Sequence, residues 1–312
     1  MSPGSPRIPP ELEREIFEIL ASVDPDSVSQ LILVAQRVKI WVEKYLYPII
    51  ILSYGESNTR GGYPFHDSLS QSLSRFNRIS PSILENAVYH LFLDGVGTHR
   101  AHSVLSSCKA VRDLWINCAH SSLLDLAGEL RLQRLQCDPL LFFRSQRNID
   151  FGHPIFSHIT HLELFFDSGA HNQEVITSVW TGLAVIPHLT HVAFSESRFL
   201  STVAPQLLKT CGSLRVLIFL PTNVDLDAHV PNIPHLAEDV RFVQIIVSPQ
   251  FSFLDDWKRG ALGGRDYWSQ AEALIARRRN GEIPVDHFVL KAFVGNSESS
   301  NELAGDTLWL IG

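Results

Sequence analysis

The chain has 312 residues and a formal net charge of −7, and its hydrophobic fraction of 45% is that of a folded protein. Clustered cations are missing, which argues against nucleic acid, and no apolar stretch approaches the roughly 18–20 residues of a membrane span. Without a secretory signal or a CxxC pair, we expect a cytoplasmic or nuclear protein with reduced thiols.

Residues 1–52 predict a helical head. Pro9 and Pro10 favour an extended entry and a first helical turn, and glutamates at positions 11, 13 and 15 suit the positive end of that helix. Two apolar helical faces follow, which together are enough to form the core of a helical hairpin. The faces are Leu12, Ile16 and Ile19 in the first helix and Leu31, Val34, Val38 and Val42 in the second.

Segment 8–20, IPPELEREIFEIL, resembles the opening of an F-box, L-P-x-E-L-x-x-x-I-F, and segment 31–41 resembles later helices of that family. The resemblance implies a partner, because F-boxes dock a Skp-type adaptor within cullin-type (SCF) ubiquitin ligases. By matching positions it assigns adaptor contacts to Pro9, Leu12, Ile16 and Phe17. Ile8 replaces the usual leucine and the second helix is short, so a head that serves only as a cap is the alternative.

A polar linker, residues 53–82, contains one short helix marked by Leu69, Leu73 and Phe76. In residues 83–250 an apolar triad then recurs seven times, with starts 21 to 30 residues apart, which is the period of a leucine-rich repeat. The triads are Val88/Leu91/Leu93, Val111/Leu114/Ile116, Leu132/Leu135/Cys137, Ile159/Leu162/Leu164, Leu189/Val192/Phe194, Leu214/Leu217/Phe219 and Val240/Val243/Ile245.

Helical periodicity between the triads supports this interpretation, with apolar faces at Val175, Val179, Leu183 and Ile186 and at Val203, Leu207 and Leu208. We therefore predict an α/β fold, in which F-box-like helices precede an irregular leucine-rich-repeat solenoid with a parallel sheet on one face. Proteins that combine F-box-like heads with degenerate repeats are abundant in fungi.

Residues that alternate with the core positions of each strand face the opposite way. We expect this strand face to bind a protein substrate through His90, Phe92, Asp113, Trp115, Arg134, Gln136, His161, Glu163 and His191. In the last two units the equivalent residues are Val216, Ile218, Phe242 and Gln244, so we expect the C-terminal segment to cover that end of the sheet.

Residues 251–294 predict a C-terminal cap. It contains Trp257, a glycine-rich turn at 260–264, and a helix from Asp266 that ends in three solvated arginines at 277–279. A final strand or extended arm follows at 285–294, and residues 295–312 form a polar tail.

The chain has no nucleophile elbow, no phosphate-binding loop and no dinucleotide fingerprint. His153, His158 and His161 are close in sequence but are not expected to converge on a metal, and His161 and His191 are more consistent with solvated imidazoles than with a pH-sensitive pair. We expect no enzyme, no metal and no cofactor. The predicted function is protein recognition, as the substrate-binding subunit of a ligase or as a stand-alone scaffold. Exposure of Leu12, Ile16 and Phe17 distinguishes the two.

Overall fold

The structure is a computed structural model that describes residues 8–53, 69–118, 122–142, 150–165, 182–195, 200, 203–221, 234–248 and 251–292. The predicted helical face at Val175 and Val179 and the predicted tail, residues 295–312, lie outside these residues. No helix of the described part is long and apolar enough to cross a bilayer.

One nine-stranded sheet organises the chain after the head. All neighbouring strands are parallel, and each strand lies beside the one that precedes it in sequence. The predicted α/β fold with a parallel sheet is thereby confirmed, and the sheet is open. The strands are β1 (Ile49–Ser53), β2 (His90–Asp94), β3 (Asp113–Asn117), β4 (Arg134–Cys137), β5 (His161–Leu164), β6 (His191–Phe194), β7 (Val216–Phe219), β8 (Phe242–Val247) and β9 (Val289–Ala292).

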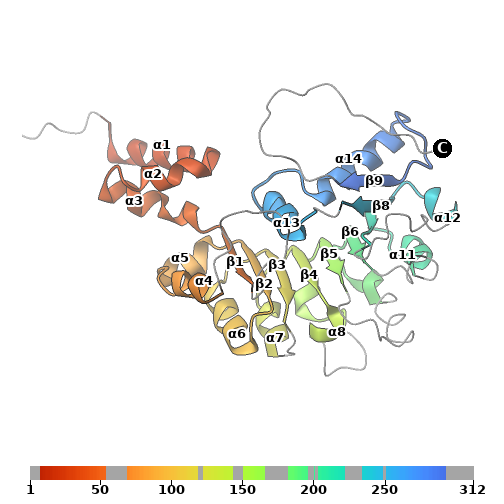
Figure 1. The fold of residues 1–312 in the computed structure, drawn as a ribbon, viewed down its shortest axis with the longest axis horizontal. Helices are drawn as coiled ribbons and strands as arrows, with labels where there is room; N and C mark the ends of the chain where they lie inside the picture. Colours follow the sequence, from red (N-terminus) through yellow and green to blue (C-terminus); the bar gives the residue numbers. More distant parts are fainter. Residues whose placement is uncertain are drawn as a thin grey trace, which may run out of the picture.

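Short helices cover one face of this sheet (Figure 1). The first six predicted triads are buried in a single core together with apolar side chains of these helices, so their assignment to the core is confirmed. The helices that contribute are α4 (Leu69–Phe76), α5 (Pro81–Ala87), α6 (Thr98–Ser107), α7 (Ser122–Gly128) and α11 (Ala204–Thr210), while α8 (Pro139–Phe142) and α12 (Pro234–Ala237) are single turns. Cys108 and Cys211 end α6 and α11 at equivalent corners, and both are buried.

The seventh triad was assigned to the wrong face. Phe242 pairs with Leu217 and packs in the helix-side core, whereas Val243 and Ile245 face the opposite way. The error has a physical cause. Because β8 is buried on both faces, its residues are nearly all apolar, and the sequence pattern does not show which of them face the helices.

Two C-terminal helices, α13 (Phe253–Ala261) and α14 (Tyr267–Arg279), lie on the second face of the sheet (Figure 1). Trp268, Ala271 and Ile275 share the buried face of α14, as predicted, and pack against Val216 and Ile218 of β7. Coverage of this end of the sheet by the C-terminal segment is confirmed.

The basic run that ends α14 is not uniformly solvated, which corrects the sequence prediction. Arg279 is exposed, but Arg278 is only 2% exposed. Its guanidinium donates hydrogen bonds to backbone carbonyls of the segment before and within β8, and to the Val285 carbonyl. Arg278 therefore joins α14 to β8 and to the segment that leads into β9.

The head precedes β1 and lies beyond that edge of the sheet (Figure 1). It consists of α1 (Pro10–Val23), α2 (Val28–Leu31) and α3 (Gln36–Val42), with short 3-10 turns at Pro25–Ser27 and Glu43–Leu46. Its own small core contains Ala21, Val28, Leu31, Val38 and Val42. This core is separate from those of the sheet, so the head forms a distinct packing unit.

Candidate functional site

Helix α1 turns its apolar row outward. Leu12 is 51% exposed and Ile16 is 53% exposed, and Ile19 and Val23 continue the row in solvent. We predicted that Leu12, Ile16 and Ile19, with Val34 of the second face, would contribute to the core of the head. For these four residues that prediction is wrong, since Val34 is also 60% exposed. The row does not pack against the sheet either, so it is available to a partner.

The inner face of α1 also carries charged side chains that pair with the rest of the head. The Glu13 carboxylate accepts hydrogen bonds from the Arg37 guanidinium at 2.6 and 3.0 Å, and the Glu18 carboxylate accepts one from Lys44 at 2.9 Å. The pKa values of both glutamates are lowered, chiefly by these hydrogen bonds. Ala21 and Phe17 on the same side of α1 pack in the small core of the head, and the leucine and isoleucine row lies outside it.

The four predicted adaptor contacts differ in how far they are exposed. Pro9, Leu12 and Ile16 are exposed, whereas Phe17 is half-buried and packs on the core of the head. Phe17 thus has a structural task within the head. Leu12 and Ile16 are the better test of partner binding, because neither is part of that core.

Exposed apolar side chains are concentrated in the head. Thirteen large hydrophobic residues of the described part are exposed, and nine of them lie between residues 8 and 40. The nine are Ile8, Leu12, Ile16, Ile19, Leu20, Val23, Leu33, Val34 and Ile40. A concentration of this kind on so small a unit is typical of an interaction surface.

The predicted recognition face of the strands is closed by the protein itself. Helices α13 and α14 contact it through polar pairs: Trp257 Nε1 donates to Asp113, Arg134 donates to Asp266 at 2.8 Å, and the Tyr267 hydroxyl donates to Glu163 at 2.9 Å. Phe92, Asp113, Gln136 and His191 are buried as a result. The expectation of an open face is therefore corrected for these four residues.

Aromatic side chains of this face stack in the register of the strands. Phe92 lies on Trp115 with ring centroids 4.2 Å apart, Trp115 lies on Phe165 at 5.1 Å, and Trp257 of α13 meets Phe92 edge-on. The stack fills the space between strands and helix. It is therefore an internal packing element of the closed face.

His161 and His191 stack with centroids 3.9 Å apart and meet the edge of Trp268. They are not the solvated imidazoles that we expected. Burial, together with the charges of His191 and Arg134, lowers the pKa of His161 to about 2, so this imidazole is neutral at physiological pH. Burial also lowers the pKa of His191, against the opposing effect of Glu272 at 3.0 Å.

Two carboxyl groups beneath the C-terminal helices have raised pKa values. Burial raises the pKa of Glu163 to about 7 and that of Asp256 to about 6. Asp256 ion-pairs with Arg259 and accepts a hydrogen bond from the Tyr267 amide. Titratable groups with shifted pKa values can mark active sites, but here they accompany helix–sheet packing and none opens into a wide cleft.

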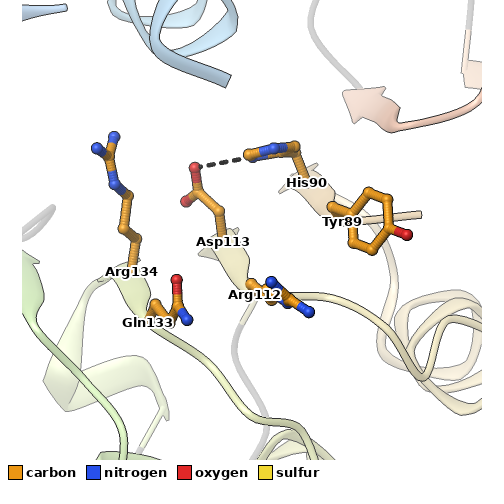
Figure 2. Close-up of a pocket in the computed structure, with 6 residues that line it drawn as sticks. All are labelled: Tyr89, His90, Arg112, Asp113, Gln133 and Arg134. Atoms are coloured by element: carbon orange, nitrogen blue, oxygen red, sulfur yellow. Dashed lines mark hydrogen bonds and ion pairs between the residues drawn. The ribbon is translucent and has the colours of Figure 1, made fainter. Parts of the chain in front are cut away.

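The part of the strand face that stays open is a hollow of about 350 Å³ at the amino ends of β2, β3 and β4 (Figure 2). Three predicted face residues line it: His90, Asp113 and Arg134. His90 Nδ1 lies 3.2 Å from Asp113 Oδ2. The sequence prediction missed Tyr89, Arg112 and Gln133, which form the outer rim because each stands one residue before its strand, outside the alternation that defined the face.

The described residues contain no group of three metal-binding side chains. His153 accepts a hydrogen bond from the Ile155 amide, and His158 is exposed. All four cysteines are free and buried, and burial raises the pKa of Cys108 to about 12, so this thiol is a packing group.

The outward row of α1 and the hollow at the amino ends of β2 to β4 are thus both open to partners. In comparison with known proteins, no family model matches this chain, and no curated protein matches it in sequence.

Proposed function

We propose that this protein is a non-enzymatic recognition subunit, whose head docks a Skp-type adaptor of a cullin-type ubiquitin ligase and whose sheet region holds a protein substrate. In this proposal the head is F-box-like, and the strand–helix units form a degenerate leucine-rich-repeat solenoid. Such a subunit works in the cytoplasm or nucleus.

One observation carries the proposal: the row at Leu12 and Ile16 is half exposed on a helix whose opposite side packs on the core of the head. Removing two aliphatic side chains of this size from water contributes about 2–4 kcal/mol to binding. A stand-alone scaffold with a capping head would instead bury these side chains against the sheet.

For the substrate, the hollow in Figure 2 is the part of the predicted face that a partner reaches in this conformation. His90 and Arg134 are partly exposed there, and Arg112 stands at the rim. The remaining predicted contacts, such as Trp115 and Glu163, would take part only with α13 and α14 moved away.

The test is a calorimetric titration of the full chain with a purified Skp-type adaptor. We expect micromolar or tighter binding, weakened at least about a hundredfold in the double variant Leu12→Asp, Ile16→Asp. The matched control, Val185→Asp with Leu262→Asp, changes two exposed apolar residues outside the head and should bind like the wild type. No binding by the intact chain would leave the stand-alone scaffold as the function.

A further inference from the structure

A second hollow lies on the helix-covered side of the sheet, between α4 and α6, with a volume of about 650 Å³. Its rim carries Arg78, from the turn after α4, and His99 and Arg100, from the first turn of α6. Neither the repeat pattern nor the head motif pointed to these residues.

The rim of this groove is positively charged on a protein whose net charge is −7. Within the described part of the chain, no carboxylate lines the groove, and Arg78, His99 and Arg100 are exposed without an ion pair. By contrast, Arg14, Arg37, Arg134, Arg241 and Arg259 each pair with an acid. The groove is therefore a local site of unneutralised positive charge.

The placement of Arg100 is unfavourable for stability. A cation in the first turn of a helix opposes its dipole, and the first turn of α6 holds Arg100 and no acidic residue. An anion bound in the groove would offset this repulsion. The stability of the fold therefore does not explain why a cationic side chain lies at the amino end of α6.

The floor of the groove is apolar. Phe76 and Val104 are buried beneath it, and Leu73 is partly buried at its side. An inorganic anion would not use this floor, whereas a peptide can place an apolar side chain on it and carboxylates on the rim.

We propose that the groove between α4 and α6 binds an acidic peptide segment of a partner protein, with an apolar side chain on Leu73 and carboxylates on Arg78 and Arg100. The groove shares no residue with the head, so this binding is independent of adaptor docking. Failure of one does not imply failure of the other.

Fluorescence anisotropy of the full chain with a labelled peptide tests the proposal. The probe has a Leu-Phe centre flanked on each side by Glu residues, and a second probe has Ser-Ser at the centre. We expect charge reversal, Arg78→Glu with Arg100→Glu, to weaken binding of the first probe at least about tenfold. The Ser-Ser probe should bind the wild type at least about fivefold more weakly, because it leaves the floor unused.

The matched control, Arg131→Glu with Lys209→Glu, makes the same change in net charge at exposed positions away from the groove and should alter binding less than about threefold. Ser103→Trp, which leaves the charge unchanged, should block the groove and also weaken binding. Circular dichroism verifies that each variant is folded.

Three results would overturn the proposal. The first is no binding by the wild type, and the second is an equal loss in the two charge-reversal variants. The third is a single-stranded oligonucleotide that binds as tightly as the peptide with the same dependence on Arg78 and Arg100, which would make the groove a general polyanion site.

Discussion

At the scale of single residues, the buried side chain of Arg278 links several segments of the C-terminal region. Arg278 donates hydrogen bonds to the carbonyls of Ala237, Asp239, Val240, Phe242 and Val285. These carbonyls belong to segments that pair as β8 and β9 or lead into them. The side chain thus supplies donors to buried backbone carbonyls that lie next to the paired strands.

Replacing Arg278 by Met should lower the free energy of unfolding by about 3 kcal/mol or more, because several buried carbonyls lose their donor at once. Urea denaturation measures this loss. Arg279→Met is the matched control, since Arg279 is exposed one position away, and it should cost no more than about 0.5 kcal/mol. Equal effects of the two substitutions would mean that the carbonyl contacts contribute little.

The raised pKa of Glu163 predicts that the stability of the fold depends on pH. Its pKa is about 7 in the folded protein and 4.5 as an ordinary carboxyl, so the folded state holds an extra proton between these values. Stability therefore falls as the pH rises from about 4.5 to 7. Glu163→Gln should remove this contribution, and the fall in unfolding free energy between pH 5 and 8 should shrink by about 1–3 kcal/mol.

Urea denaturation at both pH values, for the wild type and for Glu163→Gln, isolates this group from all others that titrate. The glutamine still offers an oxygen to the Tyr267 hydroxyl, so the packing is retained. Parallel pH profiles for the two proteins would show that Glu163 ionises normally.

At the scale of elements, α13 and α14 contact the sheet in different ways. The later turns of α14 pack on β7 and β8 through apolar side chains, whereas α13 and the start of α14 meet β2 to β5 through aromatic and charged pairs. Trp257 combines both kinds of contact, since it packs on Phe92 and donates to Asp113.

Trp257→Ala should destabilise the protein by about 3–5 kcal/mol, because it removes a buried ring. Trp257→Phe should cost less, since it retains a ring and loses the hydrogen bond to Asp113, which contributes about 1 kcal/mol. Thermal unfolding followed by circular dichroism measures both, with Lys258→Ala as the exposed neighbour. Similar melting temperatures for Trp257→Ala and Lys258→Ala would contradict the assigned role of this side chain.

Several individual elements could be predicted from the sequence. The starts of α1 and α14, the short helix α4 and the core residues of β2 to β7 all follow from local periodicity and capping. The rotation of α1 could not be predicted in this way, because α1 carries apolar side chains on two sides. Ala21 and Phe17 face the core of the head, whereas Leu12 and Ile16 face outward.

At the scale of the whole molecule, the repeat interval predicted a parallel sheet, and the strand order follows the chain. Which segment packs on each face was harder to predict. Alternation along a strand separates the two faces, but it does not show which helices cover them. Arg134 and Asp266, which form an ion pair across the closed face, are 132 residues apart in sequence. Their polar character resembles that of a solvated surface, which is why the face was expected to be open.

We proposed that the head docks a Skp-type adaptor through α1, and in the structure α13 and α14 close most of the strand face. Hydrogen–deuterium exchange of the full chain, with and without a saturating Skp-type adaptor, tests it most directly. We predict slower exchange in residues 10–23 on binding and unchanged exchange in residues 253–279. Protection in the C-terminal helices with none in α1 would contradict the account, as would an exchange pattern that the adaptor leaves unchanged throughout.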